Sequence, residues 1–294
     1  MVMRAMIRTM YGKIAQPPRM PDLVELLLEP FAYSFMIRAL AVSIFVGVMC
    51  PILGSYVVNR GLGFMGDALA HSVLPGMILA LILGVSPLVG AVPTGIVVAL
   101  AIGYLSKKAR IAEDTSIGIL FAGLFALGLI MVPIAGNVSV SVEDILLGQV
   151  LGVSNRDVVV TCLLAVLVLI VISAFHRQLV FVSFDPVGAT VIGLPTKGLD
   201  YLLFVLLSIV IVVALQAVGI VLVVAMLITP AAAAGLMARR FNRAIALGVV
   251  FGILSTVVGL YLSYFFDLPS GPSMTLVSTG IFLLAATKKK ILAR

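Results

Sequence analysis

Two ionisable residues, Asp67 and His71, lie one helical turn apart in a stretch of sequence that is otherwise mostly apolar. In a helix, the i, i+4 spacing places the carboxylate and the imidazole on one face, where both can reach the same point. If that helix crosses a membrane, each ionisable side chain costs roughly 2.5–3.5 kcal/mol on insertion scales, so its presence suggests a function. Carboxylate and imidazole groups together are suitable ligands for a divalent transition-metal ion. The pair is therefore a candidate metal site.

The composition indicates a membrane protein that must position this pair within helices. Of the 294 residues, 62% are hydrophobic, 11% are charged and none is tryptophan. Apolar runs of about 20 residues recur, and they are continuous rather than alternating, which predicts spanning helices and not a barrel. The formal net charge of +7 could suggest a nucleic-acid partner, but the basic residues form short clusters between apolar runs. We therefore expect membrane lipid, and no nucleic acid, around an all-α polytopic bundle.

The apolar runs predict about nine spans, within a range of eight to ten. The predicted spans are residues 39–58, 64–83, 87–105, 117–134, 158–175, 202–218, 219–237, 244–264 and 274–286. The run from Leu199 to Met237 is too long for one crossing of about 30 Å, so a turn is expected between Gln216 and Gly219. Residues 1–30 are predicted to be an N-terminal extension, and residues 31–294 a single transmembrane domain.

The basic clusters predict which loops face the cytoplasm. All fall on one side of the predicted spans, and the positive-inside rule places that side, with the C-terminus, in the cytoplasm. These residues are Arg60, Lys107, Lys108, Arg110, Arg177, Lys197, Arg239, Arg240, Arg243 and Lys288 to Lys290. The opposite loops contain Glu143, Asp144, Asp157 and Asp267, with Arg156 as their single cation. An odd number of spans would leave the basic N-terminus outside, a conflict that an additional span over residues 24–37 would remove.

A short helix is predicted in one of the cytoplasmic connections. Asp185 is a suitable N-cap, Pro186 suits the first helical position, and Gly193 followed by Pro195 ends the helix. The resulting helix of about two turns is too short to cross a bilayer. It is shaped either to dock into a groove of a soluble partner or to lie on the lipid surface. Its apolar residues are Val187, Val191, Ile192 and Leu194.

Four segments in this order resemble the membrane permeases of ABC importers for zinc, manganese and iron. They are residues 66–76, which contain Asp67 and His71, and residues 113–118, 184–195 and 216–233. The resemblance implies a permease domain in a prokaryotic inner or plasma membrane, paired with an identical chain or a close paralogue. It also implies cytoplasmic ATP-binding subunits and an extracytoplasmic metal-binding protein. By the same resemblance, the short cytoplasmic helix is the coupling element that contacts the ATPase, through Asp185, Pro186, Val187, Val191, Gly193 and Leu194.

The residues are compatible with this assignment. The sequence has no G-x-x-x-x-G-K-[ST] loop, since Gly12 and Lys13 are followed by Ile14, so ATP hydrolysis is expected in a separate subunit and not in this chain. Two ligands are too few for a closed metal site, but a twofold axis beside this helix would bring together two carboxylates and two imidazoles. We expect no permanent cofactor, only a transported Mn²⁺, Zn²⁺ or Fe²⁺ ion, among which the ligand types do not select.

Other readings of these residues remain open from sequence alone. Asp67 and His71 could hydrogen-bond each other, or one could pair with Arg60. A proton-coupled secondary carrier would also use such a pair. An intramembrane metalloenzyme fits poorly, because catalytic zinc sites generally have three protein ligands and no H-E-x-x-H motif occurs. His176, beside Arg177, is expected to be a surface residue at the end of a span.

The proline that follows the pair predicts a bend. Pro75 has no N–H to donate to the His71 carbonyl, four residues earlier, so the helix is expected to bend between them. The bend would free a backbone oxygen beside the candidate site.

Overall fold

The structure is a computed structural model that describes residues 29–109, 111–134 and 155–292, in which every regular element is helical. A 3-10 turn, η1 (Glu29–Ala32), precedes the first long helix. The helices are α3 (Ser34–Asn59), α4 (Met65–Ser72), α5 (Leu74–Ile82), α6 (Pro87–Ala109), α7 (Glu113–Ile134), α9 (Asn155–Phe184), α10 (Pro186–Val191), α11 (Thr196–Val218), α12 (Ile220–Met237), α13 (Phe241–Phe266) and α14 (Ser270–Leu292). Most of the predicted N-terminal extension, and the loop with Glu143 and Asp144, lie outside the described residues.

The predicted fold class, an all-α polytopic bundle, is confirmed. Within the described residues, eight helical segments are long and apolar enough to cross a membrane, with α4 and α5 together forming one of them. The remaining long helix, α14, has 23 residues but carries several serines and threonines and is not among the eight. A ninth crossing by α14 therefore stays a prediction.

Several helices extend beyond the boundaries predicted from the apolar runs. The predicted span 158–175 is part of α9, which has 30 residues and continues to Phe184. At 1.5 Å per residue, such a helix is about 45 Å long and exceeds the hydrocarbon layer. The predicted boundary was wrong because polar residues such as His176 and Arg177 end an apolar run without ending the helix.

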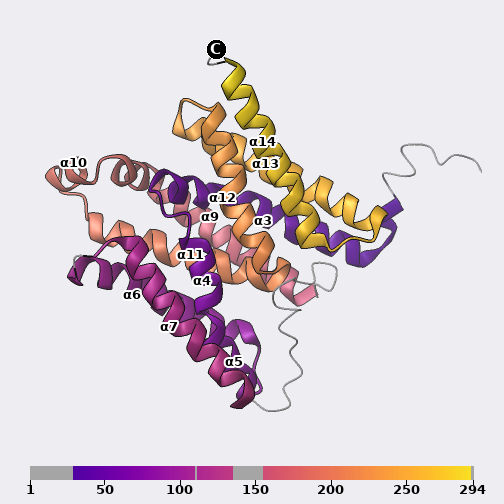
Figure 1. The fold of residues 1–294 in the computed structure, drawn as a ribbon, viewed down its shortest axis with the longest axis horizontal. Coiled ribbons are helices and arrows are strands. Elements are labelled where there is room, and N and C mark those ends of the chain that lie inside the picture. The colour runs from indigo at the N-terminus through magenta and orange to yellow at the C-terminus, as the bar shows by residue number, and fades with distance from the viewer. Residues whose placement is uncertain (1–28, 110, 135–154, 293–294) are drawn as a thin grey trace, which may run out of the picture.

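The helices form two groups joined by α9 and α11 (Figure 1). One group contains α4 to α7, and the other packs α3 against α12 and α13, with α14 on α12 and α13. The α3–α13 crossing is close: a Cβ on Gly252 would overlap the carbonyl of Gly47. Gly252 belongs to a small-xxx-small pair with Gly248, a pattern that permits such close helix approach in membranes.

The turn expected between Gln216 and Gly219 is confirmed. α11 ends at Val218 and α12 begins at Ile220, with only Gly219 between them. Gly219 has φ +83°, a backbone conformation that side-chain-bearing residues rarely adopt. A single glycine thus divides the long apolar run into two helices.

Candidate metal centre

The helix that carries Asp67 and His71 is short because the chain breaks directly after it. α4 ends at Ser72, and Val73 separates it from α5, in which Pro75 occupies the first turn. Pro75 cannot donate to the His71 carbonyl, and that carbonyl accepts instead from the N–H of Val73. The bend predicted from Pro75 is confirmed, although the carbonyl beside it is not free of hydrogen bonds.

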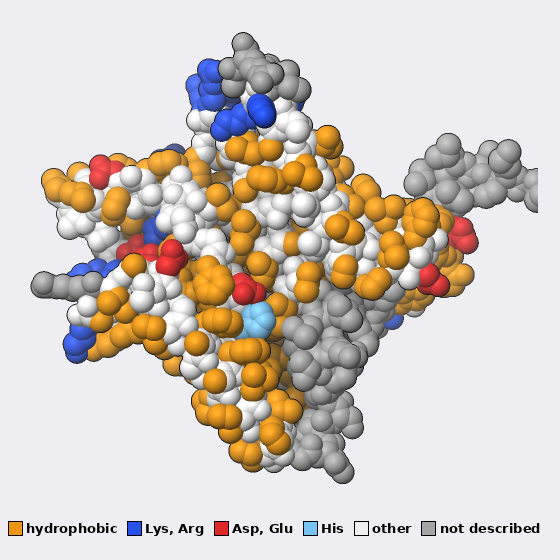
Figure 2. All heavy atoms as spheres, viewed as in Figure 1, with side chains coloured by type: hydrophobic (Ala, Val, Ile, Leu, Met, Phe, Trp, Pro, Cys, Tyr) orange, Lys and Arg blue, Asp and Glu red, His pale blue; other side chains and the backbone are white. Residues whose placement is uncertain are grey.

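α4 is buried on all sides except for one narrow stripe. Between residues 63 and 74, the residues that are not buried are Gly63, Phe64, Asp67, His71 and Leu74, and the last four follow the helical repeat along one face. The Asp67 side chain is 34% exposed and the His71 side chain 17% exposed. Figure 2 shows a histidine beside an acidic group in the middle of a mainly apolar face. The two candidate ligands therefore point away from the chain's own core.

The hydrogen bond of His71 leaves one ring nitrogen for a ligand. Its Nδ1 lies 2.9 Å from the backbone oxygen of Asp67 and 3.4 Å from Oδ1 of the same residue. A carbonyl oxygen can only accept, so Nδ1 carries the proton and Nε2 has a free lone pair. Metal-binding histidines commonly donate their other N–H to a carbonyl or carboxylate in this way, which fixes the tautomer and the ring orientation.

Two aromatic residues of α7 hold the imidazole from the side. The centroid of the His71 ring lies 5.6 Å from that of Phe121 and 5.2 Å from that of Phe125, both in edge geometry. These two rings are one helical turn apart and stacked on each other. α7 thereby positions the ring of His71, a contribution that no pattern in the sequence predicted.

One chain offers two candidate ligands at this site. No group of three or more His, Cys, Asp or Glu side chains that could hold a metal occurs among the described residues. Arg60 forms its ion pair with Asp200, at 2.9 Å, so the structure does not support its pairing with Asp67. The mutual contact between Asp67 and His71 is present, and it leaves Nε2 and much of the carboxylate available.

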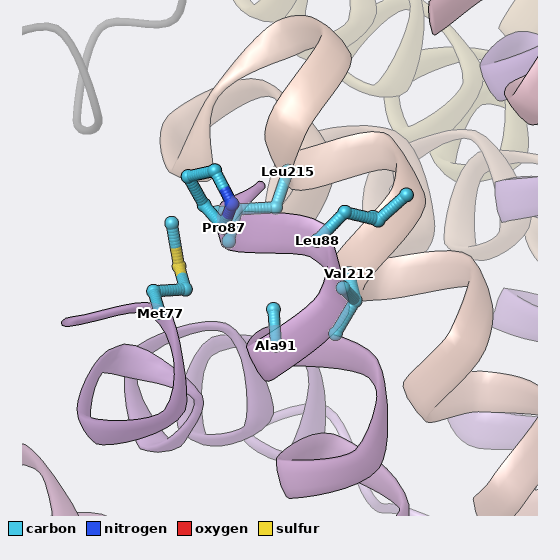
Figure 3. A pocket seen from close by; sticks show the side chains of 6 residues that line it. All are labelled: Met77, Pro87, Leu88, Ala91, Val212 and Leu215. Atoms are coloured by element: carbon cyan, nitrogen blue, oxygen red, sulfur yellow. The ribbon is translucent and has the colours of Figure 1, made fainter. Parts of the chain in front are cut away.

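Two pockets elsewhere lack suitable ligands for a cation. A cavity of about 10 Å³ between α5, α6 and α11 has only apolar side chains (Figure 3). Its lining residues are Met77, Pro87, Leu88, Ala91, Val212 and Leu215. A larger pocket of about 510 Å³ between the ends of α12 and α14 is lined by Arg239, Lys288 and Lys289, which would repel a metal ion.

The predicted short cytoplasmic helix is present as α10. The Asp185 carboxylate caps it by accepting from the N–H of Gly188 at 2.8 Å, and Gly193 ends it with φ +82°. Val187 and Val191 are 74% and 81% exposed. α10 projects from one edge of the molecule (Figure 1).

The residues predicted to contact a partner thus differ in exposure. Leu194 is only partly exposed, since it packs against the hydrophobic core, whereas Val187, Val191 and the neighbouring Ile192 are exposed. Leu194 therefore anchors the connection to the bundle, and the exposed apolar surface of α10 belongs to the other three residues.

His176 has a different environment from the one predicted. It lies two turns before the end of α9, where Nδ1 is 2.7 Å from the Tyr56 hydroxyl and Nε2 is 3.1 Å from Oδ1 of Asn242. It is half-buried between α3, α9 and α13 and is not a surface residue at a span end. Both ring nitrogens are occupied, so His176 is not free to bind a metal.

Comparisons with known proteins match nearly the whole chain. Residues 32–289 match the ABC 3 transport family. The manganese transport system membrane protein MntC of Halalkalibacterium halodurans is 44% identical over 266 residues, which cover 90% of this chain and 91% of that protein. The chelated iron transport system membrane protein YfeD of Yersinia pestis is 40% identical over 263 residues, covering 90% and 88%. The solved structure of PsaBC from Streptococcus pneumoniae in complex with Fab has a TM-score of 0.80 at 37% identity and covers 90% and 95%.

Proposed function

The chain belongs to the ABC 3 transport family, and from this premise we propose that it is the permease subunit of an ATP-driven importer of divalent transition-metal ions. The names of its relatives, which refer to manganese and chelated iron, support Mn²⁺ and Fe²⁺ as substrates. Zn²⁺ is included because carboxylate and imidazole ligands also bind it. The proposed location is a prokaryotic inner or plasma membrane.

The main support for this proposal is the narrow, partly exposed face of α4. Asp67 and His71 are the ionisable groups on the one partly exposed face of a helix that is otherwise buried. The oriented imidazole offers Nε2, and the carboxylate offers its oxygens, on that same face. Ionisable residues in membrane helices almost always face a bundle interior or a water-filled cavity, so this face suits a pathway shared with a second chain better than contact with lipid.

A second permease chain would complete the site. A twofold axis beside α4 places two carboxylates and two imidazoles around one point, enough for a closed coordination sphere. Two facing carboxylates repel each other unless a dication lies between them, and the imidazoles must be neutral to bind it. The proposed partner is therefore an identical chain or a close paralogue, with the metal moving along their interface by alternating access.

Energy and substrate would come from other proteins. The sequence has no P-loop motif, so we assign ATP binding and hydrolysis to cytoplasmic subunits that contact α10. The exposed Val187, Val191 and Ile192 form an apolar surface on α10 that suits a groove on such a subunit. An extracytoplasmic metal-binding protein would deliver the ion to the other end of the pathway.

The proposal is tested by asking whether ATP or a proton gradient drives metal uptake. The permease, reconstituted in vesicles with its ATP-binding subunits and the metal-loaded binding protein, should accumulate ⁵⁴Mn²⁺ only when ATP is supplied. A proton uncoupler should leave this uptake unchanged. Uptake by the permease alone, driven by a pH gradient, would contradict the proposal and support a proton-coupled secondary carrier.

A further inference from the structure

The end of α3 is attached to the end of α9 by side-chain hydrogen bonds. Nδ2 of Asn59 donates to the backbone oxygen of Ser183 at 3.3 Å, and Nε of Arg60 donates to the Ser183 hydroxyl at 3.1 Å. One turn earlier in α3 and two turns earlier in α9, the Tyr56 hydroxyl contacts Nδ1 of His176. Bonds at two levels thus fix the last turns of these two helices to each other.

The same arginine is also attached to α11. Nη1 of Arg60 lies 2.9 Å from Oδ1 of Asp200, and Nζ of Lys107, at the end of α6, lies 2.7 Å from Oδ2. The side chains of Arg60 and Asp200 are only 12% and 18% exposed, so bulk ions screen this pair less than a surface pair. We call Arg60, Ser183, Asp200 and Lys107 the arginine junction.

The arginine junction lies between the segments that flank α10 and the segment that leads to α4. Ser183 lies just before α10, and Asp200 lies near the start of α11, just after the α10 connection. Arg60 therefore contacts both segments that flank α10. Only residues 61–64 separate Arg60 from α4, which carries Asp67 and His71. One side chain thus links the segments on both sides of the proposed ATPase-contacting helix to the segment that leads into the proposed metal-binding helix.

The geometry points to Arg60 as a positioning residue that transmits movement of α10 to α4, an inference that rests on the proposed function in taking α10 as the ATPase contact. The planar guanidinium can contact Ser183 and Asp200 at once, which a lysine ammonium on a flexible stem does less well. Nη2 of Arg60 is buried and has no hydrogen-bond partner among the described residues. An unused buried donor is unfavourable in a purely structural contact, but it suits a group that changes partners during a transport cycle.

Hydrogen exchange measured by mass spectrometry tests this transmission on the complete complex with its ATP-binding subunits. ATP should change deuterium uptake in two peptides of the wild-type complex, one covering residues 185–195 and one covering residues 60–72. In Arg60→Gln, the response of residues 185–195 should remain, while that of residues 60–72 should be lost. Arg60→Lys keeps the charge but lacks the planar guanidinium that contacts two partners at once, so it should give a reduced response in residues 60–72.

Lys108→Gln is the matched control, because Lys108 lies beside Lys107 but donates to Tyr104 of its own helix, at 2.6 Å. It should respond to ATP as the wild type does. The inference would be overturned if ATP changed deuterium uptake in residues 60–72 of Arg60→Gln as much as in the wild type. It would also be overturned if ATP caused no change in residues 60–72 of the wild-type complex. Failure of both Arg60 variants to assemble would show that Arg60 is only a folding element.

These outcomes are separate from a failure of the proposed function. The exchange experiment needs no metal, so an importer with a different substrate would still give the predicted pattern. A wild-type permease that does not assemble with an ATP-binding subunit would refute the proposed function itself, and with it the role of Arg60.

Discussion

The α4 stripe and the arginine junction are two polar clusters in the same apolar bundle, and they differ in how they are completed. In the arginine junction, the carboxylate of Asp200 contacts two cations of the same chain. On α4, Asp67 contacts one imidazole, and its side chain is 34% exposed. The carboxylate of the first cluster is fully paired with cations of the same chain, whereas the carboxylate of the second stays partly exposed. Incomplete pairing in a membrane helix thus points to a ligand from outside the chain.

The largest effect is expected from removing the incompletely paired carboxylate. Asp67→Ala should reduce ATP-dependent metal uptake by on the order of 100-fold or more, because it removes direct ligands, whereas loss of outer-shell partners alone costs 10–100-fold. ⁵⁴Mn²⁺ uptake into vesicles measures this, and co-purification of the ATP-binding subunits checks assembly. Asp267→Asn, at an exposed carboxylate whose φ of +55° asparagine tolerates, is the matched control. Normal uptake by Asp67→Ala would refute its role as a ligand.

The next largest effect concerns the surface of α10. Val187→Asp combined with Val191→Asp should prevent the ATP-binding subunits from co-purifying, because two charges would replace the exposed apolar surface. The fold of the permease should persist, since neither side chain is buried. Leu268→Asp, an equal change at an exposed residue far from α10, should leave the complex intact. A stable complex with both valines replaced would show that α10 does not dock through this surface.

A smaller effect is expected from the packing of α5 against α6, next to the candidate metal site. Gly76 of α5 and Gly90 of α6 approach so closely that a Cβ on Gly90 would overlap the Gly76 carbonyl. Gly90→Ala should therefore destabilise the permease by about 1–3 kcal/mol, the usual cost of overpacking, and lower its melting temperature in detergent. Gly280→Ala meets no atom within 4 Å and should leave the melting temperature unchanged or slightly raised. Equal melting temperatures for the two variants would contradict this packing.

The smallest effect should come from the cap of α10. Asp185→Ala removes the acceptor for the Gly188 N–H and should destabilise the local helix by about 1 kcal/mol, whereas Asp185→Asn keeps an acceptor and should cost less. Faster hydrogen exchange in residues 185–192 of Asp185→Ala would report the loss. If the amides of residues 185–192 exchanged at the same rate in Asp185→Ala and Asp185→Asn, the cap would have no measurable role.

Local sequence signals predicted those features whose physical causes are local. Apolar runs predicted the spanning helices, a cap and a glycine predicted α10, and Pro75 predicted the break after α4. Each of these depends on residues within a few positions of one another. The i, i+4 spacing likewise placed Asp67 and His71 on one face, and the structure confirms that they are neighbours.

Contacts between distant parts of the chain could not be predicted in this way. Arg60 and Asp200 are 140 positions apart, and Tyr56 and His176 are 120 apart, so no periodic pattern relates them. His176 was placed on the surface because it adjoins Arg177 at the end of an apolar run, yet its partners come from α3 and α13. The contact of His71 with Phe121 and Phe125 was also not predicted, because it depends on how α7 packs on α4.

The most direct test of the central claim is whether nitrogen from His71 binds the transported ion. The chain has only two histidines, so a permease labelled with [¹⁵N]histidine and combined with unlabelled partners has few candidate ligands. Electron spin echo spectroscopy of bound Mn²⁺ should show a ¹⁵N coupling that persists in His176→Gln and is absent in His71→Gln. Bound Mn²⁺ without a ¹⁵N coupling in the wild type, or a coupling that survives in His71→Gln, would contradict the metal site on α4.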